Sequence, residues 1–244
     1  MVSTLSLTTK TSEFDVNFHP AIDLEDEKWE MGLLNFQSFN TIPNIDSTNN
    51  KFHFDNGKGV VTIPEGAYEV AQVIEHIISK VDEYYHERRD PDTEDEEVRI
   101  LLLEADVKTL KTTIWCVYPI DFTQENSIGP FLGFTDKEKL EARTTYDSPS
   151  TLNISKVNVI RVLTNITTGA YVNEKPTQVI YEFTLAVDSG YRISSVPQNI
   201  IYFPIIVKKI TNLHISVCDQ NFNLVNFRGE QISILLHLRK HKDK

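Results

Sequence analysis

The sequence predicts an all-β protein, an antiparallel β-sandwich that carries one amphipathic helix. Stretches in which apolar and polar side chains alternate recur along the whole chain, which is typical of strands with one buried face. The helical period of 3.6 residues occurs in one place only. The connections between the alternating stretches are long and irregular, which favours a sandwich with Greek-key crossings over an up-and-down barrel.

The clearest alternation closes the chain, in the segments 213–218 and 231–238. Successive side chains of a strand point to opposite faces, so Ile215 and Val217 share one face. By the same rule Ile234 and Leu236 share a face, and His237 points to the other side. A polar turn joins the two segments. They are therefore expected to form adjacent antiparallel strands whose apolar faces are buried.

Eight principal strands are expected along the chain, and the helix interrupts the series after the third. These strands span 14–18, 29–39, 59–64, 98–107, 112–122, 156–166, 213–218 and 231–238. A further alternating stretch, 177–187, is expected to belong to an inserted hairpin. The tripeptide Asp55-Asn56-Gly57 indicates a hairpin turn before the third strand. Residues 1–12 are rich in Ser and Thr and are expected to form a flexible N-terminal arm.

The one helix is predicted over about residues 68–86. Val73, Ile77 and Val81 form a stripe at the i, i+4, i+8 spacing that one face of a helix presents to an apolar surface. The acidic segment 88–97 ends the helix and is expected to be a solvated loop.

A metal site in this loop is the alternative, with four carboxylates as candidate ligands: Asp90, Asp92, Glu94 and Asp95. Calcium loops of the EF-hand type need a central glycine and a terminal glutamate at set spacing. The loop has no glycine, and a plain surface loop is favoured.

The charge is unevenly distributed. Residues 1–150 carry 13 Lys and Arg against 29 Asp and Glu, whereas residues 151–244 carry 11 against 6. The acidic part argues against direct nucleic-acid binding by the whole chain. The basic tail at 241–244 is expected to be solvated. No apolar stretch is long enough for a membrane span, and no secretory signal pattern is visible, so residence inside a cell is expected. Cys116 and Cys218 are then expected to be buried free thiols.

No residue stands out as catalytic, cofactor-binding or metal-binding, and no cofactor is expected. The seven histidines form no H-x-H, H-E-x-x-H or Cys/His cluster. His214 and His237 lie on the two closing strands, but no carboxylate completes a metal site beside them in the sequence. The glycines at 129 and 133 lack the phosphate-loop pattern and are expected to allow a tight turn. A glycosidase carboxylate pair stays open, because sequence does not reveal spatial pairing.

A series of longer motifs resembles a known family. The motifs are WEMGLLNFQSFNTIPNI, IPEGAYEVAQVIEHI, SIGPFLGF, VNVIRVLTNITTGAYVNEKP, VPQNIIYFPIIVKKI and DQNFNLVNFRGEQISILLHLR. In this order they look like capsid-associated proteins of Polinton/Maverick elements and adintovirus-like viruses. The resemblance spans about residues 14–239, and its most specific part is the final motif.

This resemblance implies a single jelly-roll-like antiparallel β-sandwich over residues 13–240, with the helix as an insertion. It implies a viral structural protein, a minor capsid (penton-like) or spike subunit, with localisation in the virion. The implied partners are further copies of the chain, as a pentamer or alternatively a trimer, and a major capsid protein. A ligand- or carbohydrate-binding β-sandwich is the alternative function, and an enzyme on a β-sandwich is the third.

Overall fold

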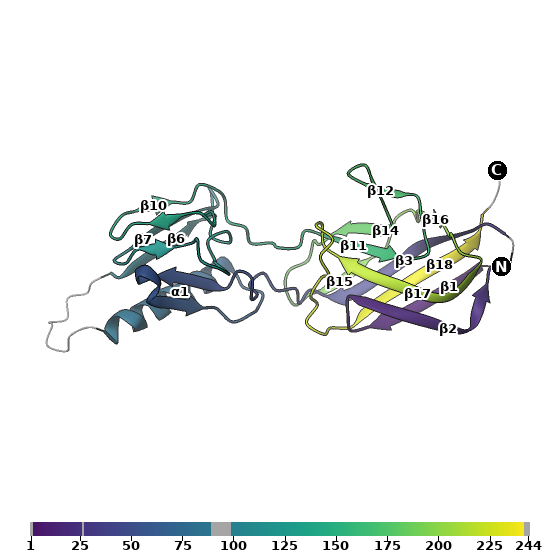
Figure 1. Cartoon of the computed structure of the whole chain (residues 1–244), viewed down its shortest axis with the longest axis horizontal. Coiled ribbons are helices and arrows are strands. Elements are labelled where there is room, and N and C mark those ends of the chain that lie inside the picture. The colour runs from purple at the N-terminus through teal and green to yellow at the C-terminus, as the bar shows by residue number, and fades with distance from the viewer. Residues whose placement is uncertain (1, 26, 89–98, 242–244) are drawn as a thin grey trace. The chain divides into compact units, whose positions relative to one another are not determined.

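The chain folds as two compact units rather than one (Figure 1). The computed structural model describes residues 2–25, 27–88 and 99–241. The first unit, here called the jelly-roll unit, comprises Met1–Ile42 and Val157–Lys244, and the inserted unit comprises Pro43–Lys156. A single domain over residues 13–240 was expected. The division arises because the buried apolar side chains form two separate clusters, one in each unit.

The jelly-roll unit consists of two antiparallel sheets. The strands of the first sheet, in spatial order, are β1 (Val2–Thr9), β18 (Ile232–Lys240), β3 (Trp29–Phe39) and β15 (Arg192–Ser195), and the short β16 (Phe203–Pro204) also pairs with β3. The strands of the second sheet are β14 (Val179–Thr184), β11 (Val159–Thr164), β17 (Lys209–Cys218) and β2 (Glu13–Asp23). A small hairpin, β12 (Ala170–Val172) with β13 (Lys175–Thr177), follows β11.

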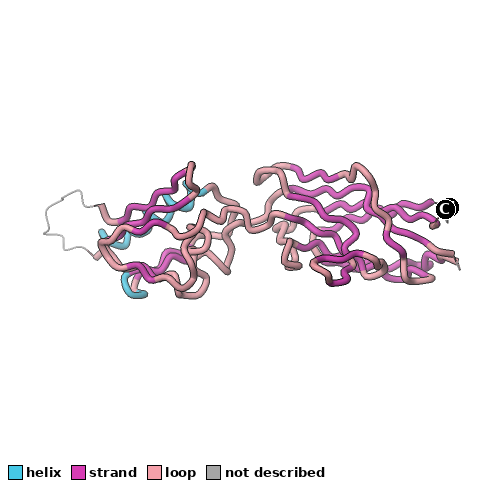
Figure 2. The backbone as a smooth tube through the Cα atoms, turned by 90° about the horizontal axis from the view of Figure 1, so that it is seen from above, coloured by secondary structure: helices cyan, strands magenta, loops and turns pink. Residues whose placement is uncertain are grey.

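The order of these strands is that of a jelly roll, as predicted. The eight main strands, in chain order, are β1, β2, β3, β11, β14, β15, β17 and β18. Each connection between consecutive strands of this series passes from one sheet to the other, except the connection from β11 to β14. Figure 2 shows these strands in magenta and the connecting loops in pink. Two four-stranded sheets joined by such crossings make two Greek keys, which define the jelly roll.

The faces predicted for the closing strands are confirmed, but their pairing is not. Ile215 and Val217 on β17 are buried, and so are Ile234 and Leu236 on β18. However, β17 and β18 lie in different sheets. The turn between them therefore crosses the sandwich, and the two strands face each other through the core instead of sharing hydrogen bonds. Alternation within a strand reports its buried face and carries no information about its neighbour.

Residues 2–9 form an ordered strand, in contrast to the expected flexible arm. β1 pairs with β18 in a continuous antiparallel register from Val2 opposite Arg239 to Thr9 opposite Ile232. Leu7 is buried and Leu5 packs against the core, while Thr4 and Ser6 are exposed. The alternation of leucine with Ser and Thr is thus a strand pattern, because Thr is a favourable strand residue and Ser is tolerated on the solvent face.

The jelly-roll strands are not all the ones expected from the sequence. The stretches 59–64, 98–107 and 112–122, which the alternation predicts as sandwich strands, contribute to the inserted unit instead. The stretch 177–187, which was assigned to an inserted hairpin, contains β14 of the second sheet. The cause is topological, because the inserted unit interrupts the jelly roll between β3 and β11, and its strands alternate in the same way.

In its described residues, the inserted unit has two small sheets and the helix α1 (Val70–His86). One sheet has the order β5 (Gly59–Thr62), β4 (Lys51–Phe54), β8 (Ile120–Asp121) and β9 (Lys139–Leu140), and the other has β10 (Tyr146–Asp147), β7 (Lys111–Cys116) and β6 (Leu101–Asp106). The short 3-10 helix η1 (Asp55–Gly57) forms the predicted turn between β4 and β5.

The helix is confirmed together with its buried stripe. Val73, Ile77 and Val81 are the buried residues of α1, which packs against β6 and β5. Glu69 caps its N-terminus, since the Glu69 backbone N–H donates to the Gln72 side chain in a capping box. The acidic loop expected over 88–97, with its four candidate metal ligands, lies outside the described residues except for Arg88, because residues 89–98 are not described. Of the basic tail, only His241 is described.

Candidate functional site

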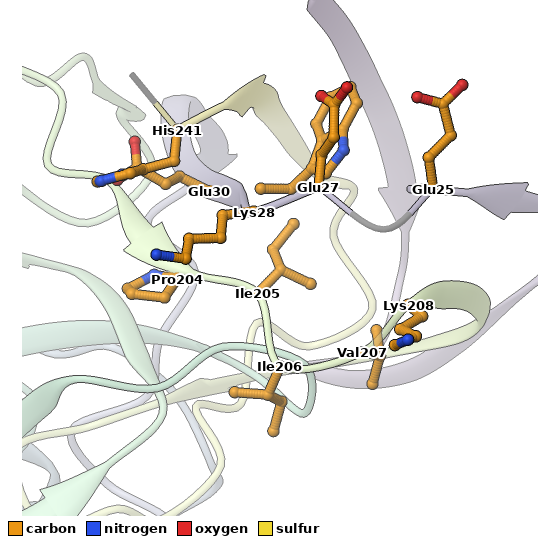
Figure 3. A pocket seen from close by; sticks show the side chains of 11 residues that line it. Glu25, Glu27, Lys28, Glu30, Pro204, Ile205, Ile206, Val207, Lys208 and His241 are labelled. Atoms are coloured by element: carbon orange, nitrogen blue, oxygen red, sulfur yellow. The ribbon is translucent and has the colours of Figure 1, made fainter. Parts of the chain in front are cut away.

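A groove of about 410 Å³ opens at one end of the jelly-roll unit (Figure 3). One wall comes from the connection between β2 and β3 together with the start of β3, and the facing wall comes from the end of β16 and the segment that follows it. The residues that line it are Glu25, Glu27, Lys28, Trp29, Glu30, Pro204, Ile205, Ile206, Val207, Lys208 and His241. This set is here called the end groove. Its first wall carries three carboxylates, whereas the facing wall is mainly aliphatic.

Glu30 is the most enclosed charged group of the end groove. The residue is only 8% exposed, and its carboxylate accepts hydrogen bonds from Arg239 Nε at 2.9 Å and His241 Nδ1 at 2.5 Å. Burial alone would raise the pKa of this carboxyl. The hydrogen bonds from His241 and Arg239 outweigh burial and lower the pKa below its ordinary value. Glu30 is therefore ionised at neutral pH, and its charge is neutralised within the protein.

Lys240 is not among the lining residues, but it contacts this wall at Glu27, Glu25 and Trp29. The Lys240 ammonium forms ion pairs with Glu27 and Glu25 and lies 5.8 Å from the centre of the Trp29 ring. The hydrogen bond to Glu27 raises the pKa of Lys240 above its ordinary value. The Trp29 indole N–H donates to the Leu24 carbonyl oxygen at 2.7 Å, which fixes the ring. The wall is thus held by contacts within the chain, without a ligand.

The end groove combines a charged wall with an aliphatic wall and has little exposed aromatic surface. None of the residues that line it is a serine, threonine or cysteine, so it lacks hydroxyl and thiol nucleophiles. Its one aromatic side chain, Trp29, is 7% exposed and offers little face for stacking a sugar. Ile206, in contrast, is 58% exposed and gives the groove an apolar contact.

A second polar cluster lies on the outer face of the second sheet, around His214. The ring nitrogen Nδ1 lies 3.2 Å from Asp15 Oδ1, and Nε2 lies 3.2 Å from both Glu13 Oε1 and Ser216 Oγ. β2 and β17 are neighbours, with His214 opposite Asp15 and Ser216 opposite Glu13, which brings the four side chains together. Ser216 contacts His214, and His214 contacts Asp15, which is the order of contacts in the Ser-His-Asp triad of hydrolases.

Two observations argue against catalysis by this cluster. Glu13 and Ser216 both contact Nε2 of His214, so this nitrogen is not available to the serine hydroxyl alone as a general base. Glu13 and Asp15 are more than half exposed and His214 is one-third exposed, and a solvated site weakens the electrostatic terms that acyl transfer needs. Within the described part of the chain, no group of three side chains is placed to hold a metal ion. The cluster is best described as a hydrogen-bonded polar surface of the sheet.

The two histidines of the closing strands lie in different sheets and have different contacts. His214 lies on β17 of the second sheet, whereas His237 lies on β18 of the first. His237 contacts Tyr202, whose ring also stacks beneath the Arg239 guanidinium at 3.4 Å from the ring centre. The structure therefore does not bring His214 and His237 into one site. Sequence reasoning missed Glu30, His241 and Tyr202, because their contacts join segments that are distant in the chain.

The cysteines are free and buried, as predicted. Burial raises the pKa of the Cys116 thiol to about 11 and also raises the pKa of Cys218. A thiol with a raised pKa is a poor nucleophile at neutral pH. Among the described residues, no helix is both long and apolar enough to span a membrane.

Comparison with known proteins gives structural matches only. No family model and no curated protein matches the sequence. The fold is similar to the crystal structure of the mavirus penton protein, with a TM-score of 0.53 and 11% sequence identity, over 99% of this chain and 100% of that chain. A chain of the Sputnik virophage structure determined by cryo-EM matches with a TM-score of 0.44 and 13% identity, over 98% of each chain. At this identity the likeness concerns the fold.

Proposed function

We propose that this protein is a viral structural protein, a minor capsid subunit of the penton type, which acts through self-assembly and protein–protein contacts. One observation carries the proposal. The mavirus penton protein has a similar fold over essentially its whole length and the whole of this chain, including the unit inserted between β3 and β11. A jelly roll alone is shared by many proteins, but a match that includes the insertion is more restrictive.

The charge distribution indicates which unit carries the self-contacts. The inserted unit has 12 Lys and Arg against 22 Asp and Glu, a net charge of −10, whereas the jelly-roll unit has 12 against 13, a net charge of −1. Copies of the inserted unit repel one another, while copies of the jelly-roll unit approach with little repulsion. The assembly contacts are therefore proposed to lie on the jelly-roll unit.

The proposed assembly is a closed ring, a pentamer with a trimer as the alternative. Closed symmetry is the norm for homo-oligomers. A major capsid protein is proposed as the second partner, and the virion as the location. A ligand-binding sandwich is the alternative function, and the end groove is its candidate site. The nearly buried Trp29 makes that groove a poor carbohydrate platform.

The test is solution mass together with negative-stain images, from low to several hundred micromolar protein. A ring of five or three subunits supports the proposal, and its symmetry selects between pentamer and trimer. Raising the salt concentration should strengthen assembly, because salt screens repulsion between the acidic inserted units. A strict monomer at all concentrations and salts, also when mixed with a major capsid protein of the same virus type, would contradict the proposal.

A further inference from the structure

The four edges of the two jelly-roll sheets differ in their protection against pairing with another chain. β2 carries Pro20, which lacks an N–H, together with the charged Glu13 and Asp15. β15 is only four residues long and begins with Arg192. β14 carries Glu182, and the β12–β13 hairpin lies close to it. Proline, charge, shortness and cover are the devices by which sheets avoid edge-to-edge association.

β1 has none of these devices. Its eight residues, VSTLSLTT, include no charge, no proline and no glycine, and its register with β18 runs without a bulge. On its other side no strand pairs with it among the described residues. Thr4, Ser6 and Thr8 are exposed, while Leu5 and Leu7 face the core. A long, uncharged edge without a bulge is a template for a further strand.

We propose that β1 is an interaction edge that pairs with β1 of a second copy, antiparallel and about a two-fold axis. The register places Ser6 opposite Ser6, Leu5 opposite Leu7 and Thr4 opposite Thr8. Both leucines then extend the core face and the hydroxyl side chains share the solvent face, which is the pairing that the two-residue period of a strand requires. The first sheet becomes continuous through two copies.

A second copy is the favoured occupant because the edge complements itself. Thr–Thr and Leu–Leu neighbours across strands are favourable, and no like charges meet. The small net charge of the jelly-roll unit allows the approach. The pairing is independent of the proposed ring, since a two-fold contact uses the same patch on both copies whereas a ring uses two different patches.

The register gives a test by disulfide formation in the full chain. Ser6→Cys places two thiols opposite each other at the two-fold axis, where paired Cα atoms are about 4.5–5.5 Å apart and within disulfide reach. Thr4→Cys is the matched control, because the two Thr4 residues are offset by four positions, roughly 13 Å along the strands. Mild oxidation should yield covalent dimer for Ser6→Cys, little for Thr4→Cys, and dimer again for the double variant Thr4→Cys/Thr8→Cys. The native cysteines are buried and contribute little background.

A charge substitution gives an independent test. Ser6→Lys places two ammonium groups opposite each other and should weaken dimerisation at least tenfold in sedimentation equilibrium. Thr184→Lys, an exposed threonine on the edge strand β14, is the control and should leave dimerisation unchanged. Thermal melts of both variants establish that each is folded.

Several outcomes would overturn the β1 pairing. These are equal oxidation of Ser6→Cys and Thr4→Cys, or a dimer that Ser6→Lys leaves intact, or a protein that stays monomeric at several hundred micromolar. A ring that survives Ser6→Lys, with no Ser6→Cys dimer, overturns the pairing and leaves the proposed function standing. A cross-linked β1 dimer without any larger assembly supports the pairing and counts against the capsid role.

Discussion

The hydroxyl of Tyr202 lies 2.6 Å from Nδ1 of His237, and the two rings meet edge to face with their centres 5.6 Å apart. This contact holds the segment 200–202 against the outer face of the first sheet. The segment crosses β3 at Gly32, where a Cβ atom would lie 2.5 Å from Ile200 Cγ2 and 2.8 Å from the Ile201 carbonyl oxygen. A glycine is therefore required at the crossing.

Removing the Tyr202 hydroxyl should destabilise the jelly-roll unit modestly. We expect Tyr202→Phe to lower the free energy of unfolding by about 0.5–1.5 kcal/mol, the net value of one hydrogen bond. The double variant Tyr202→Phe/His237→Gln should cost less than the sum of its parts, because both changes remove the same contact. Urea unfolding measures all three, with Tyr191→Phe at an exposed site as the control. If the double variant loses as much free energy of unfolding as the two single variants together, the contact contributes nothing to stability in solution.

Leu236 and His237 are neighbours on β18 that point to opposite faces. Leu236 is fully buried, so Leu236→Ala should cost about 2–5 kcal/mol through lost transfer energy and a cavity. His237→Gln should cost less, because His237 is only partly buried. Urea denaturation of the two variants compares them directly. If His237→Gln lowers the free energy of unfolding more than Leu236→Ala does, the polar contact of His237 contributes more to stability than the core packing of Leu236.

The inserted unit depends on the buried stripe of α1. Ile77→Asp buries a carboxylate with no partner and should lower the free energy of unfolding by about 3 kcal/mol or more. Ser79→Asp, on the exposed side of the same helix, is the control and should change it by about 0.5 kcal/mol or less. Thermal melts followed by circular dichroism measure both. Equal effects of the two variants would place Ile77 in solvent.

The two units have separate cores, so the inserted unit should fold by itself. A fragment of residues 43–156 is expected to unfold cooperatively on heating and to give a dispersed amide NMR spectrum. Ile77→Asp within the fragment should abolish that spectrum. A wild-type fragment without cooperative unfolding would show that the inserted unit needs the jelly roll.

Glu30 should make the stability of the jelly-roll unit depend on acid pH. Because the pKa of Glu30 is lower in the folded protein than in the unfolded chain, its contribution is present above the unfolded pKa and is lost as the pH falls through the folded pKa. Glu30→Gln should therefore cost about 1–3 kcal/mol at pH 7 and progressively less below about pH 4. Urea midpoints at pH 7 and pH 3.5 test this, with the exposed Glu174→Gln as control. A cost that does not change with pH would assign the effect to packing.

The local hydrophobic pattern predicted the strands and the helix well, but it predicted poorly which strands pair with each other. The two-residue period identified the buried faces of β17 and β18, and the helical period identified the stripe of α1. The same period could not show that β17 and β18 belong to opposite sheets, because strand pairing is decided by contacts between distant segments. β1 was missed for a compositional reason, since Ser and Thr on its solvent face resemble a polar tail.

The candidate site was less predictable than the fold. Glu30 meets Arg239 and His241 across more than 200 residues of sequence, and no motif marks that meeting. The sequence shows only that His237 and Arg239 share one face of β18 and that His241 follows directly after this strand. Such a face indicates a polar surface, but it does not identify the carboxylate that lies opposite.

The pairing of β1 with β18 has a consequence during synthesis. Thr9 leaves the ribosome long before Ile232, its partner, and at ~5–20 residues per second the delay is on the order of 10–50 seconds. The inserted unit emerges within that interval and, with its own core, can fold first. The uncharged β1 meanwhile has no partner strand, and unpaired strands of this kind are prone to aggregate. Chaperone dependence should therefore concentrate in the first strand rather than in the insertion.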